Sequence, residues 1–168
     1  MSTPAANFYN TVRADCVHNG CMPTQAKVKA VPEGHHTVCP YLVVSGVSKL
    51  IDFVKQVFGA AEVYVARRPD GTVMHAEVTI GDSMVMMGEG ASIKSFPAML
   101  HLYLEDCDAV YRRAIEAGAK SLREPAGQPY GDRSAAVEDA FGNQWFMATH
   151  LEDVSAEELE RRMNAAKP

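Results

Sequence analysis

One short pattern occurs twice between residues 37 and 152, and this repeat constrains the fold more than any single residue does. Each copy contains a short apolar strand, an amphipathic helix and three further strands. The helices are expected at 45–60 and 107–119, and Gly59 and Gly118, 59 positions apart (118 − 59), are placed to cap their C-termini. The sequence therefore predicts an α+β fold of paired βαβββ modules forming a cupped mixed sheet around a cavity.

The chain is expected to divide into three segments. Residues 1–36 lack periodicity and contain several prolines and glycines, which indicates an irregular N-terminal arm. Residues 37–152 form the repeat domain, with modules at about 37–90 and 98–152. In residues 153–168, Ser155 and Glu158 have the spacing of a capping box and predict a short helical tail.

The overall charge excludes some classes of partner. A net charge of −5 over 168 residues, with scattered Lys and Arg, argues against binding to nucleic acid. No apolar run approaches the ~20 residues that span a bilayer, and the N-terminus lacks the pattern of a secretory signal. We therefore expect a cytoplasmic protein with no membrane partner, whose cysteines are mostly free thiols.

Three cysteines and three histidines lie close together before and within the first expected strand: Cys16, Cys21, Cys39, His18, His35 and His36. Thiolate and imidazole are the ligands that zinc prefers, so a zinc site is one interpretation. Cys39 falls inside an expected strand, however, and Cys-x4-Cys is wider than the usual zinc knuckle. We prefer the interpretation of an irregular arm with incidental thiols.

Four segments carry a resemblance to a known family: PYLVVSGVSKLIDFVKQVFGAAE, RRPDGTVMHAEVTIGDSMVMM, LYLEDCDAVYRRAIEAGA and GDRSAAVEDAFGNQWFMATH. Together they resemble the glyoxalase/bleomycin-resistance/dioxygenase group, the vicinal oxygen chelate superfamily. Within it they look like a branch of small, mostly uncharacterised bacterial proteins. The resemblance implies paired βαβββ modules, a homodimer and a cavity inside the cupped sheet.

Metal-using members of this superfamily bind a divalent ion with four side chains, two from each module. Aligning the two expected helices places these positions at Pro40, Met86, Met99 and Phe146. Proline and phenylalanine offer no ligand atom, and a thioether suits only soft metals. We therefore expect no metal and no cofactor at the family's usual site.

Strand alternation predicts which side chains face the cavity instead. Six are expected to contact a ligand: Met84, Met86, Met99, His101, Tyr103 and Phe146. On the strand MHAEVTI, His75, Glu77 and Thr79 are expected on the same side, opposite the residues that pack on the helix. The alternative is structural, with methionines filling a core and His75 and Glu77 forming a hydrogen-bonded pair.

Three functional hypotheses follow. The first is a metal-free small-molecule binding protein, a homodimer by the family resemblance, that holds an apolar or aromatic ligand in the cavity. The second is an enzyme, either a metal-dependent lyase or dioxygenase with a relocated site at His75, Glu77 and His101, or one using Glu77 as a general base oriented by His75. The third is an interaction protein that uses its terminal segments. The sequence leaves open whether the chain is an enzyme.

Overall fold

The computed structural model describes residues 28–90 and 94–165, and all of its helices and strands belong to the unit Val31–Pro168. Cys16, Cys21 and His18, which the zinc interpretation needs, lie outside the described residues. None of the helices within the described ranges is long and apolar enough to cross a membrane.

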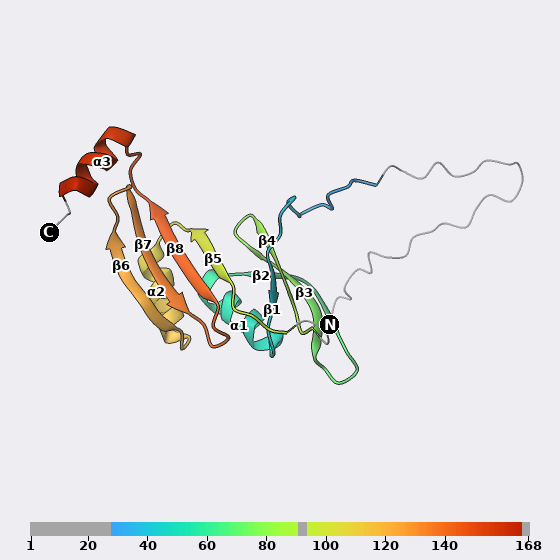
Figure 1. Cartoon of the computed structure of the whole chain (residues 1–168). Coiled ribbons are helices and arrows are strands. Elements are labelled where there is room, and N and C mark those ends of the chain that lie inside the picture. The colour runs from blue at the N-terminus through green and yellow to red at the C-terminus, as the bar shows by residue number, and fades with distance from the viewer. Residues whose placement is uncertain (1–27, 91–93, 166–168) are drawn as a thin grey trace, which may run out of the picture. The chain divides into compact units, whose positions relative to one another are not determined.

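The predicted repeat is confirmed (Figure 1). The first module consists of β1 (Tyr41–Val43), α1 (Val47–Phe58), β2 (Ala61–Arg67), β3 (Val73–Ile80) and β4 (Ser83–Gly88). The second consists of β5 (Met99–Tyr103), α2 (Cys107–Glu116), β6 (Lys120–Gly127), β7 (Asp132–Glu138) and β8 (Gln144–His150). The helix α3 (Ala156–Ala165) follows. The chain thus has the α+β fold of paired βαβββ modules.

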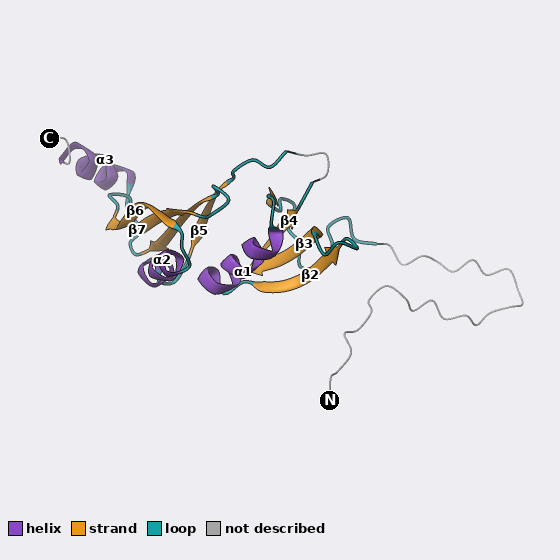
Figure 2. Cartoon of the chain, turned by 90° about the horizontal axis from the view of Figure 1, so that it is seen from below, coloured by secondary structure: helices purple, strands orange, loops and turns teal. Residues whose placement is uncertain are grey.

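Each module forms one four-stranded mixed sheet, with orders β1-β4-β3-β2 and β5-β8-β7-β6. The first strand of each module pairs in parallel with the last, and the other pairs are antiparallel. Each helix covers one face of its sheet, and α1 and α2 lie side by side (Figure 2). Among the described residues, no helix covers the opposite face of either sheet.

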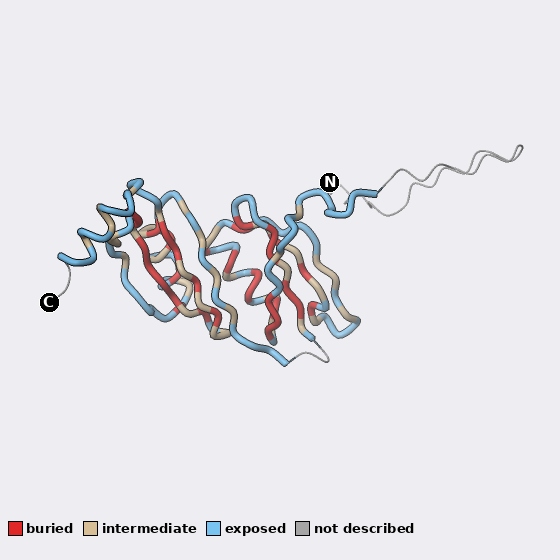
Figure 3. Tube along the Cα trace, turned by 45° about the horizontal axis from the view of Figure 1, so that its top comes forward, coloured by how far each residue is buried: buried red, intermediate tan, exposed pale blue. Residues whose placement is uncertain are grey.

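One apolar core runs through both modules, along the helix-covered faces of the sheets (Figure 3). The amphipathic pattern of α1 explains its share of this core, because the residues spaced three and four apart are the buried ones. These are Val47, Leu50, Ile51, Val54 and Val57. From the second module, Trp145 is fully buried, and its ring centroid lies 4.9 Å from that of Phe58 on α1. The indole therefore packs one module against the other.

The start of α1 lacks a local side-chain cap. Ser45 and Ser48 are the nearby residues of a type that caps helices, but the N-cap is Gly46, which has no side chain to do so. The backbone N–H of Val47 instead donates a 3.1 Å hydrogen bond to Oε1 of Glu89, which follows β4. A carboxylate distant in sequence thus takes the place of the local cap, which no short-range pattern indicates.

The predicted caps at Gly59 and Ser155 are confirmed, whereas α2 has Ala117 as its C-cap and Gly118 follows it with a φ of 89°. Asp106 accepts a 2.9 Å hydrogen bond from the backbone N–H of Ala109 at the start of α2. Gly59 ends α1 in the left-handed conformation, with a φ of 67°. The hydroxyl of Ser155 accepts from the backbone N–H of Glu158 at 3.2 Å and so caps α3. These local signals succeed because both partners lie within one helical turn.

Candidate functional site

The strand β3 alternates between the two faces of its sheet, as predicted. Three residues face α1 and are buried: Ala76, Val78 and Ile80. Three on the opposite, helix-free face are half-buried: His75, Glu77 and Thr79. The polar groups of the first module that are available for chemistry therefore lie together on one open sheet face.

A chain of polar contacts crosses this open face. The phenol oxygen of Tyr41 lies 3.2 Å from Nδ1 of His75, and Nε2 of His75 lies 3.1 Å from Oε1 of Glu77. The other carboxylate oxygen of Glu77 lies 3.7 Å from Nε2 of His35, in the segment before β1. The Glu77 side chain is 19% exposed and that of His75 27% exposed. The predicted hydrogen-bonded pair of His75 and Glu77 is therefore present. Tyr41 continues the chain of contacts beyond His75, and His35 continues it beyond Glu77.

The register of the first strands differs from the prediction, by one residue in the first sheet and by two in the second. Tyr41, rather than Pro40, lies opposite Met86, and His101, rather than Met99, lies opposite Phe146. Both equivalent pairs are 60 positions apart (101 − 41 and 146 − 86). Pro40 therefore lies on the other face of its strand from the one that Met86 occupies.

The residues at these equivalent positions do not fit the divalent ion that the fold family implies. Tyr41, Met86, His101 and Phe146 offer a phenol, a thioether and one imidazole. A hard or borderline cation needs several oxygen or nitrogen donors that converge. Across the described ranges, no three or more His, Cys, Asp or Glu residues form a group that could hold a metal ion. The structure thus does not bring His75, Glu77 and His101 together as a metal site.

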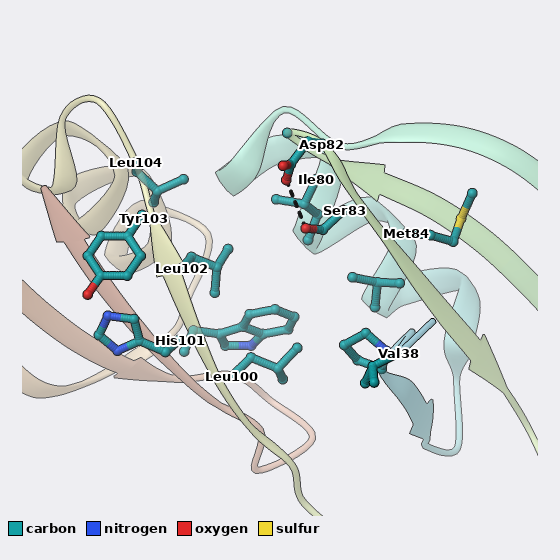
Figure 4. Close-up of a pocket in the computed structure, with 14 residues that line it drawn as sticks. Val38, Ile80, Asp82, Ser83, Met84, Leu100, His101, Leu102, Tyr103 and Leu104 are labelled. Atoms are coloured by element: carbon teal, nitrogen blue, oxygen red, sulfur yellow. Dashed lines mark hydrogen bonds between the residues drawn. The ribbon is translucent and has the colours of Figure 1, made fainter. Parts of the chain in front are cut away.

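A cleft of about 710 Å³ lies between the two modules, and we call it the intermodule cleft. Its two walls face each other in Figure 4. Apolar side chains from the first module line one wall: Val38, Pro40, Ile80, Met84 and Val85. Apolar side chains from the second module line the other: Leu100, Leu102, Leu104 and Trp145.

Polar groups also line this cleft. The turn between β3 and β4 contributes Asp82 and Ser83, whose hydroxyl donates a 2.9 Å hydrogen bond to the Asp82 carboxylate. His101 and Tyr103 also belong to β5, but their rings point away from the opposite wall (Figure 4) and lie edge to face with centroids 5.0 Å apart. The cleft thus combines apolar walls with an acceptor and a hydroxyl at the turn between β3 and β4.

The six residues predicted to contact a ligand are brought together only in part. Met84, His101 and Tyr103 line the intermodule cleft. The other three, Met86, Met99 and Phe146, do not line it. Met86 and Phe146 are half-buried on the open faces of their sheets, and Met99 is 71% exposed.

Sequence reasoning missed the leucines of this cleft. Leu100, Leu102 and Leu104 alternate with His101 and Tyr103 along the segment LHLYL. The alternation was a usable signal, because it gives this strand one wholly apolar face. The alternation could not identify the opposite wall of the cleft, since that wall belongs to the other module.

A family model described as the Glyoxalase/Bleomycin resistance protein/Dioxygenase superfamily matches residues 34–147. The chain belongs to this superfamily. It is 30% identical over 138 residues to an uncharacterised protein of Mycobacterium bovis, a match that covers 75% of this chain and 91% of the relative. The resemblance stated from the sequence is therefore confirmed.

Two solved structures share the fold. TioX from Micromonospora sp. ML1 superposes with a TM-score of 0.57 at 24% identity, over 66% of this chain and 95% of that one. The fosfomycin resistance protein FosX from Listeria monocytogenes superposes with a TM-score of 0.53 at 17% identity, over 74% and 97%. At these identities the likeness establishes the arrangement of the modules and nothing about the ligand.

Proposed function

We propose that this protein binds an apolar or aromatic small molecule in the intermodule cleft, without a metal. The observation that carries this proposal is the volume of the cleft, about 710 Å³, between two apolar walls. Sites for drug-sized ligands have volumes of roughly 300–1,000 Å³ and combine apolar linings with a few polar groups. This cleft has both properties.

The two kinds of lining have different roles in the proposal. Burial of a ligand against Pro40, Leu100 and Leu102 provides affinity, at about 25 cal/mol for each Å² of apolar surface removed from water, before the costs of association. The carboxylate of Asp82 and the hydroxyl of Ser83, in the turn between β3 and β4, then orient a polar end of the ligand. Methionine at one wall suits ligands of irregular shape, because its side chain adapts.

An environment-sensitive dye tests the cleft directly. We expect 8-anilinonaphthalene-1-sulfonate to bind with saturable fluorescence and one site per chain. Replacing Ser83, an exposed residue at the cleft, with tryptophan fills the space and weakens binding by about tenfold or more. The matched control is Ser95→Trp, an exposed serine outside the cleft, which leaves binding unchanged. Equal affinity in both variants, or no saturable binding, contradicts the proposal.

We also propose that the protein is a homodimer. The helix-free faces of the sheets expose large side chains, with Tyr64 at 50%, Met99 at 71% and Tyr103 at 68%. Groups of this kind at the surface are typical of interaction sites. Light scattering after size exclusion is expected to give twice the chain mass of 18.3 kDa. A mass of one chain at micromolar concentration contradicts this part of the proposal.

A further inference from the structure

The open face of the first sheet carries a polar arrangement that the intermodule cleft does not use. Tyr41, on β1, ends the chain of contacts through His75 to Glu77. At the equivalent position of the second sheet, His101 lies beside Tyr103 with ring centroids 5.0 Å apart. Within the described residues, the Tyr103 hydroxyl has no hydrogen-bond partner. Only the first sheet therefore links a phenol to an imidazole and a carboxylate.

The backbone leaves space for the phenol oxygen of Tyr41. Gly88 on β4 is buried, and a Cβ added there would lie 2.4 Å from that oxygen and 2.8 Å from the carbonyl oxygen of Met74. Any side chain at Gly88 would displace the phenol from His75. The Tyr41 hydroxyl is thus held by its hydrogen bond to His75, and it fits there because residue 88 has no side chain.

The order Tyr41, His75, Glu77 determines which atoms of these side chains carry protons. The Glu77 carboxylate only accepts hydrogen bonds, so the proton of neutral His75 resides on Nε2 and points at Oε1 of Glu77. Nδ1 of His75 then carries a lone pair and accepts from the O–H of Tyr41. Hydroxyl, imidazole and carboxylate in this sequence form the arrangement by which a side-chain hydroxyl is activated as a base or nucleophile.

We infer that Tyr41 is an acid–base group acting on a planar small molecule with an ionisable hydroxyl, with His75 and Glu77 as its positioning residues. A planar ligand is favoured because the phenol lies against the imidazole of His75, which a second phenol flanks. The rings of Tyr41 and His75 are stacked with centroids 5.7 Å apart, and Tyr64 lies 6.3 Å from His75. Tyr64 is also half exposed and so available for contact with a ligand.

The step balances without a co-reactant. The O–H bond of the ligand breaks and its proton passes to the phenol oxygen of Tyr41. The original phenol proton passes to Nδ1 of His75, which becomes an imidazolium held by the Glu77 carboxylate. The ligand remains as an oxyanion on the open sheet face. This inference does not rest on binding in the intermodule cleft, which lies elsewhere in the fold.

An aryl sulfonyl fluoride is the probe of Tyr41 activation. The phenol oxygen forms a bond to sulfur, the sulfur–fluorine bond breaks, fluoride leaves, and the phenol proton passes to His75. Labelling rates at each tyrosine are followed by peptide mass spectrometry. Tyr41 is 44% exposed, against 50% for Tyr64 and 68% for Tyr103. Activation makes Tyr41 the fastest of the three by at least about tenfold, as general-base catalysis does. Rates that follow exposure overturn the inference.

Variants separate activation from mere structure. In His75→Ala, labelling of Tyr41 falls by about tenfold or more, and imidazole added to the solution restores it, because a diffusible base replaces the missing one. Glu77→Gln gives a partial loss, and Gly88→Ala gives a loss that imidazole does not restore. The rate at Tyr103 serves as the folding control and stays constant in all three. Unchanged labelling of Tyr41 in His75→Ala, or a loss without rescue, overturns the inference.

Discussion

The indole Nε1 of Trp145 donates a 2.9 Å hydrogen bond to Oδ2 of Asp139, and both side chains are buried. The same carboxylate accepts from the backbone N–H groups of Phe141 and Asn143, at 2.8 and 2.9 Å, and from Nδ2 of Asn143 at 2.9 Å. One buried carboxylate therefore holds the turn between β7 and β8 and orients the tryptophan that lines the intermodule cleft. The run EDAFGNQW thus has a structural basis.

Replacing Asp139 with alanine is expected to destabilise the protein by about 3–5 kcal/mol, because several buried donors lose their acceptor at once. Trp145 is the single tryptophan, so its fluorescence during urea unfolding reports the change at the site itself. The matched control is Asp52→Ala on the exposed side of α1, expected to change the free energy of unfolding by less than about 0.5 kcal/mol. Similar effects in the two variants would show that the network contributes little.

The repeated pattern was sufficient to predict the topology, because strand alternation, helical periodicity and glycine caps all act over a few residues. The register was wrong for a specific reason. From Val47 to Gly59 is 12 positions (59 − 47), but from Cys107 to Gly118 is only 11 (118 − 107). Alignment on the terminal glycines therefore shifts the first strand of one module against that of the other by one residue. The sequence of either helix alone does not show that the two helices differ in length.

The cleft was only partly predictable, because its two walls come from different modules. Strand alternation assigns Leu102 to the apolar face of β5, but it does not say that Pro40 and Met84 lie opposite. The contact between Tyr41 and His75 likewise joins residues 34 positions apart, through the parallel pairing of β1 with β4. The ligand, the homodimer, the absence of a cofactor and the cytoplasmic location stay predictions, as does a role of the terminal segments in interaction.

The aromatic contact between the modules gives a second prediction about stability. The ring of Phe58 lies 4.9 Å from Trp145, and Nε of Arg113 on α2 donates a 3.0 Å hydrogen bond to the backbone carbonyl of Val57 beside it. Phe58→Ala removes a large part of this contact, and we expect a loss of about 2–4 kcal/mol together with a red shift of the Trp145 emission. Phe58→Leu, which keeps most of the apolar volume, should lose less than half as much. Equal losses of stability in the two variants would mean that Phe58 acts within α1 and not through its contact with Trp145.

A third prediction concerns the loop between β6 and β7. Gly131 is buried at a φ of +96°, and a Cβ there would lie 2.1 Å from the backbone carbonyl oxygen of Glu152. Its own carbonyl oxygen accepts from the N–H groups of Leu151 and Glu152, at 3.0 and 3.1 Å. Gly131→Ala is expected to cost more than about 2 kcal/mol, because strain and a backbone clash add.

The matched control for this loop is Gly71→Ala. Gly71 also has a positive φ, +86°, but a Cβ there meets no atom of the described residues within 4 Å, so the substitution adds conformational strain alone, about 1 kcal/mol. Urea unfolding of the two variants measures the difference. If Gly131→Ala costs no more than Gly71→Ala, then the segment after β8 is free to move away from the loop.

The fourth prediction concerns pH, through His150 at the end of β8. Its Nδ1 lies 2.8 Å from the buried carboxylate of Asp132, and its Nε2 lies 3.1 Å from Asp153. The hydrogen bond to Asp132, followed by that to Asp153, raises the pKa of His150 above its ordinary value of 6.5. Because the folded state holds this proton more tightly, the pair stabilises the fold fully below the unfolded pKa. The contribution disappears as pH rises through the folded pKa.

The variant His150→Gln keeps a hydrogen-bonding side chain but cannot gain the charge. We expect wild type to exceed it in free energy of unfolding at about pH 6, where the imidazole of the folded state is protonated. At about pH 9 the two proteins should converge, because neither then carries a charge at this position. Paired urea titrations at both pH values measure the gap. A gap that is constant with pH, or larger at pH 9, would mean that His150 contributes through packing and neutral hydrogen bonds rather than through its proton.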